Sequence, residues 1–329
     1  MKKMLFISML VMGVISASAY DLAVENADGV IIYYNYINDG TELEVTSGYS
    51  SSYCGVINIP DTVVFLNRTR RVTSIEKRAF ERCSNLTSVT IGNNVASIGE
   101  YAFIECSGLT SVTMGKSVTT IGIFAFSRCE KLQKVIVNDI AAWCKIHFYS
   151  HEANPLYFAG RLYNDENSEI KDLVIPISVE SIGNCAFSGC SGLTSVIIPS
   201  SVTSIGNSAF YECSGLTSVN IPNSVTCIGN SVFAECSSLT SVIIPNSVNT
   251  VSSYAFQGCS GLTSVIIPNS VTTISSYSFY GCSGLTSVVI PNSVNTISSY
   301  AFQGCSGLTY IIIPNSVTTV GEFAFSGCI

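Results

Sequence analysis

A 23-residue unit recurs along most of the chain, and no other feature of the sequence constrains the fold as strongly. Its cysteines lie 23 residues apart in two runs, and a phenylalanine stands three residues before each of them. These cysteines are Cys83, Cys106 and Cys129, followed by Cys190, Cys213, Cys236, Cys259, Cys282, Cys305 and Cys328. A period of about 20 to 50 residues indicates a solenoid, in which each unit packs on its neighbours.

Each unit contains the pattern L-x-x-V-x-I, as in Leu262, Val265 and Ile267. In a strand, alternate side chains face the core, and the proline that follows ends the strand because it has no amide proton to donate. The pattern V-x-x-I-G then returns the chain along the opposite side. Segments such as residues 207–213 are expected to form short helical turns capped by Asn or Ser. The sequence therefore predicts an α/β-type repeat solenoid with a parallel β-sheet on one side and short helical turns on the other.

The run IPNSVTCIGNSVFAECSSLTSV, residues 221–242, resembles the BspA-like class of leucine-rich repeats, which occurs on surface proteins of anaerobic bacteria. The resemblance covers about residues 55–329. It implies a parallel-stranded solenoid with an extracellular role as an adhesin or binding protein. It transfers no catalytic residue, because the repeat motif contains none.

The first residues carry the pattern of a secretory signal. Lys2 and Lys3 precede an apolar run from Met4 to Ile15, and residues 17–19 form an Ala-Ser-Ala cleavage site. This pattern predicts a signal peptide over residues 1–19 and a secreted or cell-surface location on a bacterium. The apolar run is too short for a permanent membrane span, and no other segment is long and apolar enough.

The remaining chain divides into a cap and repeats. Residues 20–54 predict an N-terminal β cap, because β-branched and aromatic segments flank Asn38-Asp39-Gly40, a strong hairpin signal. Repeats are expected over residues 55–137, a lengthened variant repeat over residues 138–169, and further repeats over residues 170–329 without a C-terminal cap. The last expected strand would then leave an open edge, which indicates a shortened product or contact with another chain.

A loop insertion is expected near residues 64–72, and it brings a cluster of basic side chains: Arg68, Arg70 and Arg71, with Lys77, Arg78 and Arg82 further along. Such a cluster could bind an acidic partner such as a sulfated glycan or nucleic acid. The alternative is a solvated loop balanced by Glu76 and Glu81. The net charge of −7 and the lack of interleaved aromatic residues argue against nucleic acid as a partner.

The variant repeat contains the only tryptophan and the only histidines of the chain. The spacing over residues 139–151 predicts a helix with Cys144, His147 and His151 on one face. A zinc site would need a fourth ligand, Glu152 or Asp139, so a metal-dependent enzyme is one hypothesis. The competing interpretation is that these side chains pack, because Trp143 and its apolar neighbours favour burial. Similar W-C-x-I elements in the resembling family imply a structural role, and we predict no metal and no cofactor.

The second half of the chain contains few side chains that could take part in catalysis. From Leu173 onward it has no Lys, Arg or His. General acid–base catalysis needs a positioned proton carrier, and a nucleophilic serine needs a base beside it. We therefore expect a protein that is not an enzyme.

What this half presents is a repeated surface. The outward positions of its strands carry Ile197, Asn220, Ile243, Ile266, Val289 and Ile312, beside a row that includes Ser241, Ser264 and Tyr310. One interpretation is a binding sheet for a protein or glycan of a host or neighbouring cell. Another is that β-branched residues simply favour exposed strands, as in a structural envelope or matrix component without a specific ligand.

A second row is aromatic, with Tyr254, Tyr277, Tyr300 and Phe323 spaced 23 residues apart. Tyrosine offers amphipathic contact area, so the row could hold a sugar or a protein edge. Alternatively, the rings stack mainly on one another.

The fourteen cysteines could be paired or free, because an exported protein can form disulfides. Equivalent positions on parallel rungs point their Cβ atoms the same way, whereas a disulfide needs them to converge. We expect the in-register cysteines to be thiols that pack as small hydrophobic residues. Cys54, Cys144, Cys185 and Cys227 lie outside the register and are expected to be unpaired too.

Overall fold

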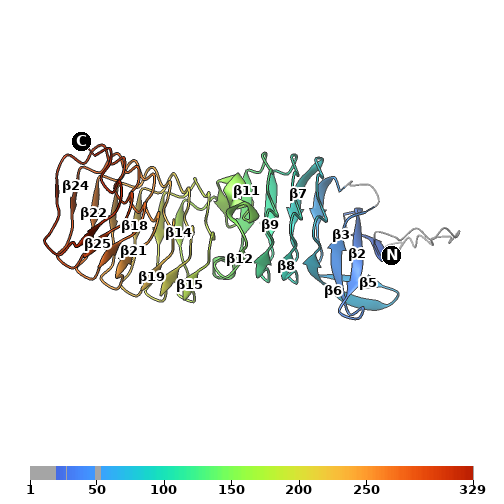
Figure 1. Cartoon of the computed structure of the whole chain (residues 1–329). Helices are drawn as coiled ribbons and strands as arrows, with labels where there is room; N and C mark the ends of the chain where they lie inside the picture. Colours follow the sequence, from blue (N-terminus) through green and yellow to red (C-terminus); the bar gives the residue numbers. More distant parts are fainter. Residues whose placement is uncertain (1–19, 27, 49–52, 329) are drawn as a thin grey trace.

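The computed structural model describes residues 20–26, 28–48 and 53–328, so the predicted signal peptide lies outside the described residues. The chain winds into an elongated solenoid of about eleven turns, with the N-terminal strands at one end and the last repeats at the other (Figure 1). Successive turns are offset by 23 residues wherever the repeat is regular. The predicted repeat solenoid is confirmed.

The strand side of the solenoid consists of two parallel sheets formed by the L-x-x-V-x-I segments. The first contains β4 (Gly55–Asn58), β7 (Leu86–Thr90), β9 (Ser111–Met114), β11 (Lys134–Val137) and β13 (Leu162–Tyr163). The second contains β14 (Asp172–Val174), β16 (Ser195–Ile197), β18 (Ser218–Asn220), β20 (Ser241–Ile243), β22 (Ser264–Ile266), β24 (Ser287–Val289) and β26 (Ile311–Ile312). The central valine of each regular strand is buried, so its two neighbours face outward.

The return side, formed by the V-x-x-I segments, is also parallel sheet. Its strands are β8 (Ser97–Ile98), β10 (Thr120–Ile121), β12 (His147–Phe148), β15 (Ser181–Ile182), β17 (Ser204–Ile205), β19 (Cys227–Ile228), β21 (Thr250–Val251), β23 (Thr273–Ile274), β25 (Thr296–Ile297) and β27 (Thr319–Val320). Each has only two residues, which gives too little alternation for a strand signal in the sequence.

The turn side carries the segments that lead from each return strand to the next L-x-x-V-x-I segment. These segments do not form the helical turns expected from the sequence. Along each rung, one amide bonds within the turn and the next bonds to the following rung. Tyr211 N donates to Ser208 O at 3.1 Å, whereas Phe210 N donates to Val232 O at 2.9 Å. Ser208 and Glu212 have φ of 54° and 57°, in the left-handed region, which interrupts any right-handed helix. The helical segments are short and lie in the variant repeat: α1 (Ile140–Trp143), α2 (Leu156–Ala159) and the 3-10 turn η1 (His151–Ala153).

The core between these sides is built from stacked columns of identical side chains. The phenylalanine rings lie nearly parallel, with centroids 4.7 Å apart for Phe80 and Phe103 and 5.5 Å apart for Phe302 and Phe325. Most of the cysteine sulfurs beside them donate to a phenylalanine carbonyl of the preceding rung, as in Cys259 Sγ, which donates to Phe233 O at 3.1 Å. Burial raises the pKa of the Cys259 thiol to about 12. The in-register cysteines from Cys106 onward are thiols, as predicted.

The N-terminal cap is an antiparallel sheet of β1 (Leu22–Glu25), β2 (Ile31–Ile37) and β3 (Glu42–Thr46). The predicted hairpin is confirmed, and its turn places Asn38, Asp39 and Gly40 at positive φ. Strand β3 then pairs in parallel with β6 (Arg68–Ile75) and joins the cap to the return side.

The sequence predicts a loop near residues 64–72, but the chain forms a hairpin there. Strand β5 (Thr62–Phe65) pairs antiparallel with the first half of β6. Leu66 and Asn67 form the two-residue turn, with φ of 49° and 58°. A two-residue turn with both φ values positive matches the twist of the flanking strands, which explains why the extra residues pair.

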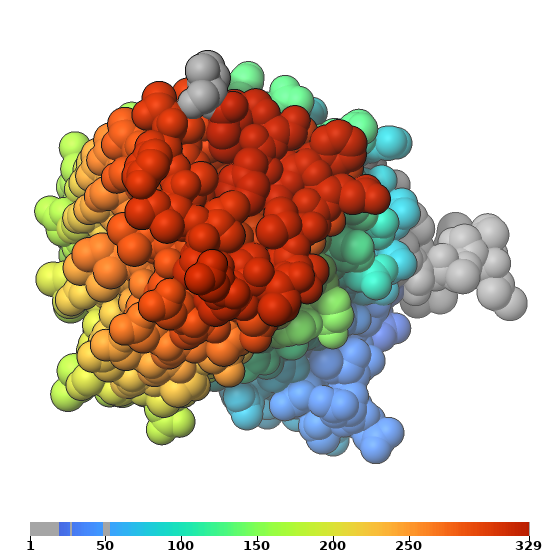
Figure 2. Space-filling model, turned by 60° about the vertical axis from the view of Figure 1, so that its left-hand side comes forward, coloured from blue at the N-terminus to red at the C-terminus, as the bar shows by residue number. Residues whose placement is uncertain are grey.

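The last described rung has no rung packed against its outer side. Figure 2 looks obliquely at this end of the solenoid, drawn in red. Val320 is 52% exposed, whereas its equivalent one rung earlier, Ile297, is fully buried.

Candidate functional site

The apolar row consists of Ile197, Ile243, Ile266, Val289 and Ile312 on the second strand-side sheet, with Asn220 in register between the first two. The apolar members are between 57% and 77% exposed, and Asn220 is exposed as well. They face outward because the residue before each of them in the strand points inward. That residue is a buried valine, except in the last strand, where it is the half-buried Ile311. Parallel pairing with a constant register aligns the row across successive strands.

Hydroxyl groups flank the apolar row. Ser241, Ser264 and Tyr310 are exposed on the same face. One position earlier, threonines form a ladder between rungs: Thr240 Oγ1 donates to Thr217 O at 3.2 Å, and Thr263 Oγ1 donates to Thr240 O at 3.1 Å. Because the sequence has no basic residue beyond Lys171, this face offers apolar contacts and hydroxyl groups without cations.

The aromatic row lies on the turn side, and a strand of the return side separates it from the apolar row in each rung. Its ring centroids are 4.8 Å apart for Tyr254 and Tyr277, and 4.6 Å apart for Tyr277 and Tyr300. These ring planes are within 7° of parallel, so the faces cover one another. A ligand would meet mainly ring edges and hydroxyl groups, since the faces of the inner rings are occupied.

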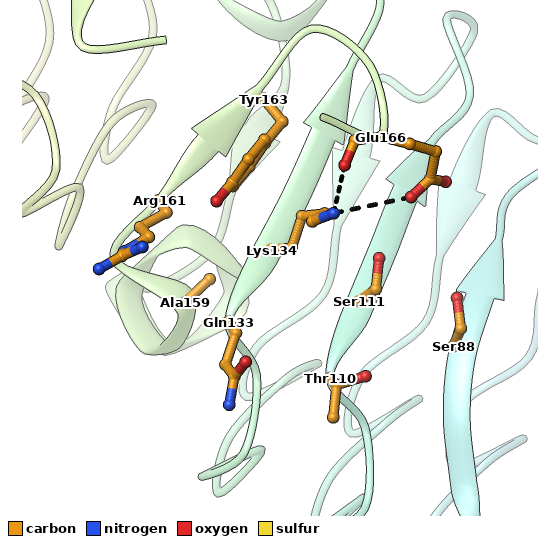
Figure 3. A pocket seen from close by; sticks show the side chains of 9 residues that line it. All are labelled: Ser88, Thr110, Ser111, Gln133, Lys134, Ala159, Arg161, Tyr163 and Glu166. Atoms are coloured by element: carbon orange, nitrogen blue, oxygen red, sulfur yellow. Dashed lines mark hydrogen bonds and ion pairs between the residues drawn. The ribbon is translucent and has the colours of Figure 1, made fainter. Parts of the chain in front are cut away.

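A cavity of about 550 Å³ lies on the other strand-side sheet, next to the variant repeat (Figure 3). Its floor is an outward row in which Ser88 aligns with Ser111 and Ser111 with Lys134. Tyr163 projects from the adjacent strand β13, Arg161 lies directly before that strand, and the segment after β13 brings Glu166 over the floor (Figure 3). Thr110, Gln133 and Ala159 complete the lining.

The charges in this cavity are balanced. Lys134 Nζ donates to the Glu166 backbone carbonyl, lies 3.7 Å from the Glu166 carboxylate and stands 4.9 Å from the centroid of the Tyr163 ring. Arg161 Nε lies 4.0 Å from the Glu169 carboxylate. The 23-residue spacing of Ser88, Ser111 and Lys134 was available in the sequence, but the segment that walls the cavity belongs to the variant repeat, which occurs once.

The repeats that build these surfaces match the family model described as BspA type leucine rich repeat region, over residues 55–154, 163–286 and 272–329. The chain belongs to this family. The resemblance stated from the sequence is therefore confirmed. No curated protein matches the sequence.

Several solved bacterial structures share this fold. A leucine-rich repeat protein from Bacteroides ovatus is 25% identical, with a TM-score of 0.52 over 94% of this chain and 93% of that one. A leucine rich cell surface protein from Faecalibacterium prausnitzii is 26% identical, with a TM-score of 0.50 over the same shares. A leucine-rich repeat protein from Eubacterium ventriosum has a TM-score of 0.57 over 90% and 92% of the two chains, but its 23% identity supports the fold alone.

The structure does not bring together the residues of the metal hypothesis for the variant repeat of this BspA-type chain. The predicted helix over residues 139–151 ends early: α1 stops at Trp143, His147 belongs to β12, and His151 begins η1. Cys144 is buried, whereas both histidines are exposed, so the three do not share a face. Nowhere in residues 20–26, 28–48 and 53–328 do three or more His, Cys, Asp or Glu residues group as they would around a metal ion.

The fourth-ligand candidates have structural partners instead. Asp139 caps α1 by accepting a hydrogen bond from Ala142 N at 2.9 Å. Glu152 accepts a hydrogen bond from Ser127 Oγ at 2.7 Å.

Several basic side chains near the hairpin of β5 and β6 are paired across rungs. Lys77 lies 2.8 Å from the Glu100 carboxylate, and Arg82 lies 2.9 Å from that of Glu105, which holds the pKa of Glu105 below its usual value. Arg70 Nε donates to Gly40 O at 2.7 Å. Of the two acids expected to balance the cluster, Glu81 pairs with Arg78, whereas Glu76 bonds to Thr46 and Asn35.

The described part of this BspA-type chain holds no helix with the length and apolar character that a membrane crossing requires.

Proposed function

We propose that this protein is exported and acts outside the bacterial cell or on its surface, where it binds a protein or glycan of a host or neighbouring cell without catalysing a reaction. The observation that carries the proposal is the apolar row, exposed together with Asn220 across the six strands from β16 to β26, which contain no charged residue. Contiguous exposed apolar surface is the usual mark of an interaction site.

The energetics favour recognition at this row. Covering one exposed isoleucine gains roughly 1.5–3 kcal/mol, so a few of these side chains can anchor a partner. The row is held by parallel strands, and little backbone ordering is needed on binding, which lowers the entropic cost of association. The threonine ladder beside it uses its donors within the protein, so the edge of the row keeps its shape.

Two observations support export. The Lys2-Lys3 start, the apolar run and the Ala-Ser-Ala site have the order of a secretory signal. A solved structure with 26% identity is described as a leucine rich cell surface protein.

The test is a glycan and extracellular-matrix protein array probed with residues 20–329. Ile243→Asp and Ile266→Asp place a charge in the apolar row and are expected to weaken saturable binding at least about tenfold, because the charge must be desolvated. Asn249→Asp is the matched control, because it adds the same charge at an exposed position on the return side of the Ile243 rung. Equal binding by all variants would overturn the proposed surface. A complete absence of saturable binding would favour an envelope or matrix component.

A further inference from the structure

We propose that the cavity lined by Ser88, Ser111, Lys134, Arg161, Tyr163 and Glu166 binds one or two units of an uncharged sugar. The inference rests on the proposed recognition role, but not on the apolar row, because the cavity belongs to the other strand-side sheet. Its volume of about 550 Å³ lies within the range of about 300–1,000 Å³ typical of small-molecule sites.

The cavity contains polar groups that have no partner among the described residues. Within the described part of the chain, the Ser88 and Ser111 hydroxyls, the Gln133 amide and the Tyr163 hydroxyl make no hydrogen bond to another residue, and all four side chains line the cavity. Thr110 differs, because its Oγ1 donates to Thr87 O at 2.9 Å. Hydroxyl and amide groups both donate and accept, so this set matches a ligand that does the same at several neighbouring atoms.

The charged side chains of the cavity favour an uncharged ligand. Lys134 already pairs with Glu166, and Arg161 lies beside Glu169, so a charged ligand would compete with an existing pair. The ends of both pairs are still accessible: the Glu166 side chain is 74% exposed and that of Arg161 is 60% exposed. A carboxylate can accept from several donors, and a guanidinium has five N–H groups. Sugar hydroxyls can bond to both without separating either pair.

The cavity also has an apolar wall. The Tyr163 ring and the Ala159 methyl group offer apolar surface beside the polar floor. A sugar ring has a face of C–H groups and an edge of hydroxyls, and a tyrosine beside hydrogen-bonding groups is complementary to both. The site is also preformed, because four paired strands supply its floor and one wall.

The test measures binding of single sugars to residues 20–329. Saturation-transfer NMR and calorimetry use methyl glycosides of glucose, galactose, mannose, N-acetylglucosamine and N-acetylgalactosamine, with the methyl glycoside of glucuronic acid as the charged comparison. Ser111→Tyr fills the cavity floor, and Tyr163→Ala removes the apolar wall. Ser306→Tyr is the matched control, because it makes the same change at an exposed position outside both the cavity and the apolar row.

We expect at least one neutral glycoside to bind saturably, with a Kd near 1 mM, corresponding to about −4 kcal/mol. Ser111→Tyr and Tyr163→Ala should each raise that Kd at least about tenfold, while Ser306→Tyr should leave it unchanged. Circular dichroism spectra matching those of the wild type would show that the variants fold.

Three results would overturn the inference: no binding of any neutral glycoside, binding of the glucuronide alone, or neutral binding that Ser111→Tyr leaves intact. Ile243→Asp separates this site from the proposed function, because it should not change glycoside binding. If Ile243→Asp also leaves macromolecular binding intact while Ser111→Tyr abolishes glycoside binding, the apolar-row proposal fails and the cavity stands.

Discussion

Trp143 Nε1 donates a hydrogen bond to the backbone carbonyl of Ala186 at 2.7 Å, from the variant repeat to the next regular rung. In a regular rung the equivalent carbonyl receives a backbone amide, as when Phe187 N donates to Ala209 O at 2.8 Å. The variant repeat follows another path, and Asn154 Nδ2 adds bonds to Cys185 O at 2.7 Å and Ala186 O at 3.0 Å. At Ala186 O, side-chain donors of the variant repeat thus take the place of the backbone amide.

Removing the side-chain amide of Asn154 should destabilise the junction between the variant repeat and the regular rung that follows it. Asn154→Ala removes the bond to Cys185 O and leaves the buried Leu156 N, which donates to Asn154 Oδ1 at 2.9 Å, without its acceptor; such a loss costs about 1–3 kcal/mol. Urea denaturation followed by circular dichroism measures the change. Asn164→Ala, at an exposed position, is the control and should change stability by less than about 0.5 kcal/mol. Equal effects of the two substitutions would contradict the role assigned to Asn154.

The phenylalanine column should contribute far more to stability than the tyrosine row. Phe256 is buried between Phe233 and Phe279, with ring centroids 5.8 Å and 5.4 Å away, so Phe256→Ala should cost about 3–5 kcal/mol. Tyr254 stacks on Tyr277 but is 38% exposed, so Tyr254→Ala should cost about 1 kcal/mol. Thermal melts of both variants test the difference, and similar melting temperatures would refute it.

Alanine substitution at two glycines of one rung should lower the stability for different physical reasons. Gly281 has φ of +71°, and an added Cβ would meet no atom closer than 3.9 Å, so Gly281→Ala should cost only the left-handed strain of about 1–2 kcal/mol. At Gly284 an added Cβ would lie 2.4 Å from Ser260 O, so Gly284→Ala forces the backbone of two rungs apart and should cost more. Gly281→Asn is the control: asparagine tolerates positive φ, so it should cost less than alanine. Urea midpoints give the order, and a larger loss for Gly281→Ala would contradict it.

The buried thiols should make the fold sensitive to alkaline pH. Burial raises the pKa of Cys259 from 9.0 to about 12, so the unfolded chain ionises first as the pH rises. The stability is therefore complete below pH 9 and declines toward pH 12, by about 1.4 kcal/mol per pH unit for each such thiol. Urea unfolding under reducing conditions at pH 8 and pH 10 measures the decline, and Cys259→Ala should reduce it. A pH-independent free energy of unfolding would refute the linkage.

The sequence spacing was sufficient to predict contacts between residues that occupy equivalent positions in successive repeats. The alternation in Ser241-Val242-Ile243 sets which side chains are buried, because successive residues of a strand point to opposite faces. The 23-residue period then aligns Ile243 with Ile266 without further information. The apolar row, the stacked rings and the thiol column follow from these two local rules.

Tertiary structure decided the features that the period does not describe. The left-handed conformations of Ser208 and Glu212 are favoured because their rung bonds to the next one, although neither is glycine. The chain leaves the helical path after Trp143 because Cys144 is buried in the core and His147 pairs with the return side. The cavity needs Glu166 over Lys134, 32 residues apart in a segment that occurs once. In a repeated unit, the spacing alone identifies which residues of successive rungs are neighbours. In a segment that occurs once, the contacts depend on the tertiary structure.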